Sequence, residues 1–150
     1  GIGQAAKPMA QKIIEVGLTP VSEYYGSEVT LHYPGLYAGS TDLVCLHNDM
    51  ETIVDFKQSN RPKKEEWVQD YYLQIAAYAM AHDHVYGSKI RQGVIMMCTP
   101  DLYYQEFKIQ DADLRSWKHQ FLKRLDMYHE LKHSEKEQAN VQIAAEDFTK

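Results

Sequence analysis

A nearly continuous apolar run at residues 90–99 (IRQGVIMMCT) constrains the fold of this chain more than any other segment. Its length suits a β-strand, and its lack of polar–apolar alternation predicts a strand that is buried on both faces. Such a strand needs a packed layer on each side of its sheet. The run therefore predicts a sheet that is flanked by helices.

The remaining segments supply the other strands and helices of such a fold. Apolar residues spaced three or four apart indicate helices, and alternating or β-branched residues between turn signals indicate strands. The first three strands follow one another through short turns, which predicts an antiparallel meander. We expect helices at 5–16, 65–86 and 112–133, and strands at 26–33, 37–47, 51–58, 90–99 and 102–109. The order α-β-β-β-α-β-β-α predicts an α/β (α+β) fold with a mixed sheet of about five strands.

The length of 150 residues predicts one domain, with a core at 1–133 and a polar C-terminal tail at 134–150 that frays or docks on a partner. No stretch approaches the roughly 18 apolar residues of a membrane span, and no secretory signal is recognisable. We therefore expect an intracellular, cytoplasmic protein without a membrane partner. Cys45 and Cys98 are expected to be buried thiols, and two cysteines are too few for a four-thiolate iron–sulfur cluster.

Charged side chains gather around the third expected strand. Asp55 and Lys57 are two residues apart, so a strand presents both on one face while Phe56 points to the other. Asp42 lies on the preceding strand, and the turn at 47–50 brings its region beside that of Asp55. Two carboxylates offer the hard oxygen ligands that Mg²⁺ prefers. An ammonium group beside them can orient a water molecule or stabilise charge on a phosphoryl group.

Taken alone, Asp55 and Lys57 leave a second interpretation open, because such pairs on a strand often form a surface ion pair worth less than about 1 kcal/mol. The surrounding sequence favours a site. The chain carries three motifs in order: GxxD at 39–42, DxK at 55–57 and QxxxY at 74–78. Over about residues 20–130, this set resembles the RecB-like branch of the PD-(D/E)XK nucleases, including phage exonucleases and mitochondrial genome-maintenance exonucleases.

The resemblance implies a restriction-endonuclease-like core and a role for each matching residue. Asp42 and Asp55 would bind Mg²⁺ or Mn²⁺ with help from the Phe56 carbonyl, and Lys57 would be the catalytic lysine. Glu28, on the strand before the first motif, would be a further acid near the metal; the alternative for it is an ion-pair partner.

The same resemblance assigns the QxxxY residues to the active site. Gln74 and Tyr78 are four residues apart and share one helix face. In the family this face holds the nucleophile or the DNA backbone. The alternatives are a buried amide for Gln74 and a core aromatic residue for Tyr78.

One departure from the family concerns a metal-binding histidine, which many relatives carry on a helix well upstream. This sequence starts too late to contain that helix, and His32 on a predicted strand is a poor substitute. Three explanations remain open: the chain is a fragment, it uses fewer ligands, or another chain supplies one. His82 and His84 do not replace it, since side chains two residues apart on a helix diverge.

The loop after the DxK motif is basic. Arg61, Lys63 and Lys64 can hold DNA phosphates, although the formal net charge of the chain is -5. The alternative is a solvated loop. Three aromatic residues begin the next helix, and we expect at least two in the core and one able to stack on a base: Trp67, Tyr71 and Tyr72.

The resemblance therefore implies a Mg²⁺- or Mn²⁺-dependent deoxyribonuclease. It would be an exonuclease that acts on single-stranded DNA ends in phage replication, recombination or repair. Two alternatives remain: a nuclease fold that binds DNA or a partner without cutting, and an endonuclease.

Overall fold

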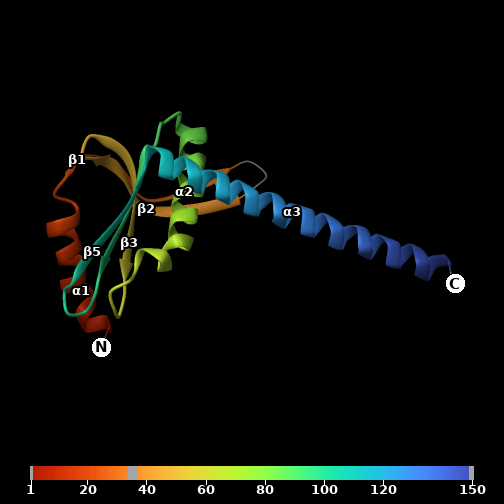
Figure 1. Ribbon diagram of the computed structural model, residues 1–150, viewed down its shortest axis with the longest axis horizontal. Coiled ribbons are helices and arrows are strands. Elements are labelled where there is room, and N and C mark those ends of the chain that lie inside the picture. Colours follow the sequence, from red (N-terminus) through yellow and green to blue (C-terminus); the bar gives the residue numbers. More distant parts are fainter. Residues whose placement is uncertain (1, 34–36, 149–150) are drawn as a thin grey trace. The chain divides into compact units, whose positions relative to one another are not determined.

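The computed structural model describes residues 2–33 and 37–148, with the backbone alone for residues 2–5, 27–33, 37–41 and 147–148. It divides into two compact units, Gly1–Lys118 and His119–Lys150, and the first carries the sheet. The elements are, in chain order (Figure 1), α1 (Ile2–Lys12), the π-helical turn η1 (Ile13–Gly17), β1 (Val21–Tyr33), β2 (Tyr37–His47), β3 (Met50–Gln58), the 3₁₀ turn η2 (Glu65–Trp67), α2 (Gln69–Tyr86), β4 (Gln92–Cys98), β5 (Tyr104–Gln110) and α3 (Asp111–Phe148).

The described strands form one sheet in the order β1-β2-β3-β4-β5. All neighbours are antiparallel except β3 and β4, which run parallel. A parallel pair needs a long crossover, and α2 provides it. The expected mixed sheet with flanking helices is confirmed. Within the described residues, no helix is both long enough and apolar enough to cross a membrane.

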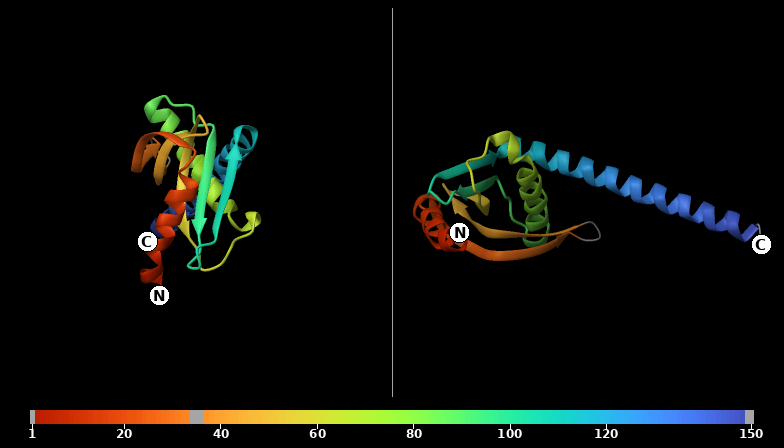
Figure 2. Two further views of the ribbon diagram at one scale, coloured as in Figure 1. Left: turned by 90° about the vertical axis from the view of Figure 1, so that its left-hand side faces the viewer. Right: turned by 90° about the horizontal axis from the view of Figure 1, so that it is seen from below.

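Helices α1 and α2 cover opposite faces of the sheet (Figure 2). On one face Ile53 of β3 belongs to the core cluster that contains Ile75 of α2. On the other face Val54 packs in the cluster of Met9 and Ile13, from α1 and η1. Strand β4 is buried at every residue, as its apolar run predicts. The alternation along β3 therefore decides which side chains face α2.

Helix α2 lies directly on the backbone of β4. A Cβ atom at Gly93 would lie 2.3 Å from Cγ2 of Ile75, a separation that atoms do not tolerate. The absence of a side chain at this position lets the helix approach closely. At its end the chain turns at Gly87, whose φ of 65° suits glycine and whose N–H donates to the Asp83 carbonyl at 2.9 Å. The helix that carries the QxxxY motif is therefore fixed at both its centre and its end.

Two element ends differ from the sequence prediction. Strand β1 begins at Val21, five residues early, because its first residues pair with the end of β2 around a register shift. Helix α3 continues to Phe148 rather than ending near 133. Residues 134–148 lack an apolar stripe, but they are rich in good helix formers and carry short-range pairs such as His133–Glu137 at 2.9 Å. The separation of a core at 1–133 from a tail stays a prediction.

Candidate metal and catalytic site

A two-residue turn sets the register of β2 against β3. Residues 48–49 have positive φ angles of 51° and 62°, the conformation of a tight hairpin turn whose twist matches its strands. The ladder that starts at this turn pairs Leu43 with Val54. Asp42 and Asp55 are the next residues along the two strands, so the turn places the two acids side by side.

The structure brings Asp42, Asp55 and Lys57 together on the α2 side of the sheet. Oδ2 of Asp42 accepts a hydrogen bond from the Phe56 N–H at 2.7 Å. Nζ of Lys57 lies 3.2 Å from Oδ2 of Asp55, and the side chain of Asp55 is also hydrogen-bonded to that of Asp42. The two acids and the amine share one small region, as the spacing of the motifs predicts.

The environment of Asp55 favours a bound cation. Its side chain is 17% exposed. Burial, together with the hydrogen bond to Asp42, raises the pKa of Asp55 to about 6 against the opposing effect of Lys57. When two carboxyl groups are close enough to share a hydrogen bond, the state in which both are ionised is disfavoured unless a positive charge compensates them. Two hard oxygen donors that lack full compensation fit Mg²⁺ or Mn²⁺.

The cluster opens into a cavity of about 270 Å³. Gln74 and Tyr78 contribute to it from α2, so they share one helix face as predicted. Gln74 is exposed, so the buried-amide alternative does not hold for it, whereas Tyr78 is only 4% exposed. Burial raises the pKa of Tyr78 to about 12, so its hydroxyl keeps its proton. The cavity is lined by Asp42, Ile53, Asp55, Phe56, Lys57, Gln74, Ile75 and Tyr78.

The aromatic residues in η2 and at the start of α2 divide into core and exposed positions as expected. Tyr72 is buried in the core with its ring centroid 5.5 Å from that of Trp117, and Tyr71 packs against the same core. Trp67 remains 58% exposed. The sequence reasoning missed one contact: Nζ of Lys57 lies 4.7 Å from the centroid of the Tyr71 ring. The signal for it was present, because Tyr71 precedes Gln74 by three residues and so shares its helix face.

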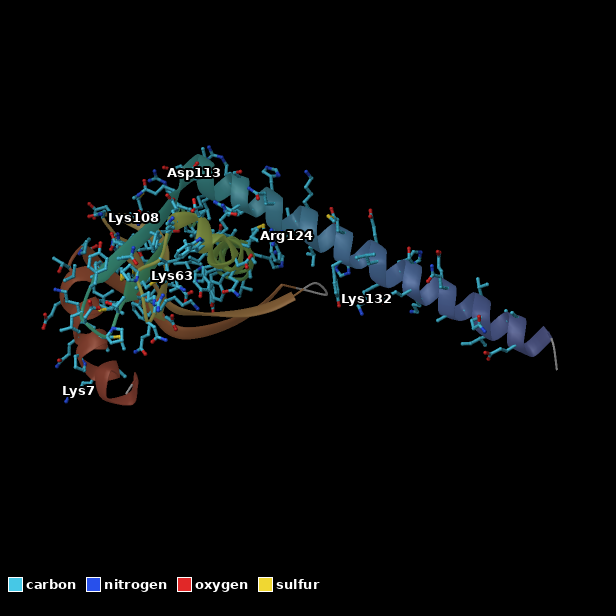
Figure 3. The ribbon with its side chains drawn as sticks, turned by 60° about the horizontal axis from the view of Figure 1, so that its bottom comes forward. Lys7, Lys63, Lys108, Asp113, Arg124 and Lys132 are labelled. Atoms are coloured by element: carbon cyan, nitrogen blue, oxygen red, sulfur yellow. The ribbon has the colours of Figure 1, made fainter. Side chains whose placement is uncertain are left out.

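The basic loop that follows β3 is anchored to β5. The Lys63 N–H donates to Oε1 of Gln105 at 2.7 Å, and Nε2 of Gln105 donates to the Lys63 carbonyl at 2.9 Å. Lys63 is labelled in Figure 3. Arg61 and Lys64 are exposed, and Lys63 is half-buried. The loop therefore presents cations at a fixed position shortly after Lys57. Its contact with DNA stays a prediction.

Two residues considered from the sequence, Glu28 and His32, lie in β1 with side chains outside the described residues. The backbone of Glu28 lies between residues whose β2 partners flank Asp42. The metal role of Glu28 stays a prediction. Among the side chains that are described, no group of three or more His, Cys, Asp or Glu residues comes together around a possible ion position.

The cysteines and the paired histidines match the sequence expectations. Cys45 and Cys98 are fully buried free thiols, and burial raises the pKa of Cys45 to about 11. His82 is buried while His84 is exposed, so their side chains diverge.

Comparison with known proteins bears on the fold. No protein-family model and no curated protein matches this sequence. Among solved structures, a protein from Eubacterium rectale that is provisionally named an exonuclease matches 83% of this chain and 50% of its own, at a TM-score of 0.56 and 16% identity. A phage-related exonuclease from Haemophilus somnus 129PT matches 89% of this chain and 73% of its own, at a TM-score of 0.53 and 13% identity.

This chain shares its fold with these two structures, a mixed sheet with flanking helices of the restriction-endonuclease-like kind. The resemblance carried by the three motifs is thus confirmed at the level of the fold, in structures that the sequence alone matches poorly. The chain spans half the length of the Eubacterium rectale protein and about three quarters of the phage-related exonuclease.

Proposed function

We propose that this chain is a metal-dependent deoxyribonuclease in which Asp42 and Asp55 bind the metal and Lys57 is the catalytic amine. One observation carries the proposal: these three side chains meet on one face of the sheet, with 3.2 Å between Lys57 and Asp55. They line a cavity with Gln74 and Tyr78, in a fold shared with exonucleases. A surface ion pair alone would need neither the second acid nor the cavity.

Asp42, Asp55 and the Phe56 carbonyl would hold Mg²⁺ or Mn²⁺. When bound, such an ion polarises the scissile phosphate and lowers the pKa of a coordinated water. The hydrogen bond from the Phe56 N–H orients the Asp42 carboxylate in advance. Because the Asp42 carboxylate is already oriented, it needs less rearrangement to bind a metal ion.

Lys57 stabilises negative charge during hydrolysis. Its ammonium group is held between the Asp55 carboxylate at 3.2 Å and the face of the Tyr71 ring at 4.7 Å. Two contacts from different elements restrict its position, and a preorganised donor is most effective where charge develops. The ammonium donates to a non-bridging phosphate oxygen or to the attacking water, and a 3′-hydroxyl leaves.

Gln74 and Tyr78 position the substrate from the opposite wall of the cavity. The exposed amide of Gln74 can donate to a phosphate oxygen, and the protonated hydroxyl of Tyr78 can donate to the DNA backbone or to the nucleophile. Arg61, Lys63 and Lys64 hold neighbouring phosphates from the loop.

We further propose an exonuclease that acts on single-stranded DNA ends in phage replication, recombination or repair. The names of the two structural relatives support the exonuclease assignment. A Mg²⁺-dependent assay on labelled single-stranded DNA tests it, with linear and circular substrates compared. We expect degradation of linear DNA alone, and cleavage of circles would indicate an endonuclease instead.

The Lys57→Ala variant tests the mechanism, with an expected loss of activity of roughly 10²–10³-fold. Lys108→Ala is its matched control, because Lys108 also follows an acid by two residues on a strand and lies 3.2 Å from Glu106. The control should keep full activity. Equal activity in the wild type and Lys57→Ala would overturn the mechanism. DNA binding without cleavage by the wild type would indicate a binding module.

A further inference from the structure

We propose that a second cavity on the α2 side of the sheet binds an unpaired nucleobase of the single-stranded substrate. The inference rests on the proposed nuclease function and adds a base-binding subsite to it. The cavity measures about 440 Å³, larger than the catalytic one. It is lined by Tyr25, Gly26, Val44, Glu51, His82, Tyr86, Gly87, Ser88 and Ile90.

The two cavities follow one row of side chains on α2. Gln74, Tyr78, His82 and Tyr86 recur every four residues, so they form one face of the helix. The first two line the catalytic cavity, and the last two line the second cavity. Each step along this row advances about 6 Å along the helix axis. One strand lying along α2 can therefore reach both cavities.

The walls of the second cavity suit a flat aromatic ring. Tyr25 and Tyr86 keep 50% and 60% of their surface exposed, so a ligand can reach both rings. Val44 and Ile90 supply buried apolar surface between them. Stacking on aromatic side chains is the general way in which proteins hold single-stranded nucleic acid without regard to sequence. A base in this cavity would therefore stack on the exposed rings of Tyr25 and Tyr86.

The charge of the cavity excludes a phosphate. Among the lining residues that the structure describes none is Lys or Arg, while Glu51 contributes a carboxylate whose Oε2 accepts the Lys89 N–H at 2.7 Å. A phosphate would be repelled here, whereas the uncharged base of a nucleotide would not. This arrangement matches a strand whose phosphates lie at the catalytic cavity and basic loop while one base turns into the second cavity.

Hydrogen bonds fix the polar edge of this cavity. Oγ of Ser88 donates to Oδ1 of Asp83 at 2.7 Å and lies 2.6 Å from Nδ1 of His82. Because the Ser88 proton points to Asp83, Nδ1 of His82 must be the donor, and Nε2 of the neutral ring is an acceptor. His82 and Glu51 both offer acceptors, so bases with an exocyclic amino group suit the cavity better than thymine.

The test is equilibrium binding of short single-stranded homopolymers to the full chain in EDTA, where cleavage does not intervene. Tyr25→Ala and Tyr86→Ala should each weaken binding of oligo-dC by about tenfold, the effect of losing one stacking contact. Tyr24→Ala is the matched control, because Tyr24 is the neighbouring residue on the same strand, is 58% exposed and does not line the cavity. Its affinity should be that of the wild type.

Glu51→Gln should reduce the preference for oligo-dC over oligo-dT, while Lys108→Ala, at a residue that does not line the cavity, should leave it unchanged. Wild-type affinity in both Tyr25→Ala and Tyr86→Ala, or an equal loss in Tyr24→Ala, would overturn the subsite. These outcomes do not depend on cleavage. A chain that binds through Tyr25 but shows no Lys57-dependent hydrolysis would keep the subsite and remove the nuclease mechanism.

Discussion

Two groups of polar side chains lie on opposite faces of the same strands, and their surroundings differ. On the α1 face, Gln92 is fully buried and its Nε2 donates to Oγ1 of Thr52 at 2.9 Å. It also lies 3.3 Å from Nδ1 of His47, and its Oε1 accepts from Gln110. This group joins β2, β3, β4 and β5 through uncharged side chains that are partners of one another.

On the α2 face, the group formed by Asp42, Asp55 and Lys57 is charged and partly open to solvent. Asp55 is 17% exposed and Lys57 30%. Burial raises the pKa of Asp55, so the ionised form of this carboxyl is disfavoured where it stands. The α1-face group holds strands together, whereas the α2-face group places two acids beside a single lysine at the edge of a cavity.

The largest expected effect comes from Asp55→Asn. Activity should fall by roughly 10²–10³-fold, because a metal ligand is lost. The melting temperature should stay constant or rise, because the substitution removes a buried charge and its repulsion with Asp42. Nuclease assays and calorimetry measure the two. A clear loss of stability in Asp55→Asn would mean that the α2-face group is structural after all.

Gln92→Leu should produce the opposite pattern. The substitution leaves polar groups of His47, Thr52 and Gln110 without their partner in the core, and we expect a loss of about 2–4 kcal/mol in the free energy of unfolding. Urea titration measures it. Cleavage by the folded fraction should be unchanged, so a specific loss of activity without a loss of stability would contradict the division between the faces.

Gly93→Ala tests how tightly α2 is held against the sheet. Its Cβ would lie 2.3 Å from Ile75, and we expect a loss of about 1–3 kcal/mol together with lower activity, since α2 carries Gln74 and Tyr78. Gly87→Ala is the control. It disfavours a φ of 65° by about 1–2 kcal/mol but meets no atom within 4 Å, so the cleavage rate at saturating DNA should remain even though Gly87 lines the second cavity. Equal activity losses in both variants would argue against transmission through Ile75.

The smallest effect concerns pH, measured by urea unfolding in EDTA between pH 7 and 5. Burial lowers the pKa of His47, so its contribution to stability is present above about 6.5 and is lost as pH falls. The pKa of Asp55 is raised to about 6, so the destabilisation caused by its buried negative charge disappears as pH falls. Each proton changes stability by at most about 1.4 kcal/mol per pH unit. As pH falls, Asp55→Asn should therefore lose stability more steeply than the wild type. Equal slopes of unfolding free energy against pH in the two proteins would show that Asp55 does not offset His47.

The catalytic cluster was predictable because it depends on local counting. A spacing of two positions from Asp55 to Lys57 sets a common strand face, and a spacing of four from Gln74 to Tyr78 sets a common helix face. The tight turn then placed Asp42 within reach. These rules act over a few residues, and the structure shows the resulting positions.

What the sequence did not reveal depends on which distant strands are neighbours. The parallel pairing of β3 with β4 puts Thr52 opposite Gln92, which no local pattern indicates. The contacts of His47 with Gln92 were missed for this reason, although a histidine and a glutamine at the ends of apolar strands were a signal. The C-terminal half of α3 was missed because helix propensity alone, without an apolar stripe, sustains it.

The turn at residues 48–49 also limits how this protein can change in length. Asp42 and Asp55 are 13 residues apart, and the turn sets the pairing register of both strands. A single inserted residue in β3 would move Val54 into the place of Asp55 and send the acid to the α1 face. The hairpin can therefore tolerate substitutions at other positions. An insertion or deletion between the two acids would separate them, unless a β-bulge restores the register.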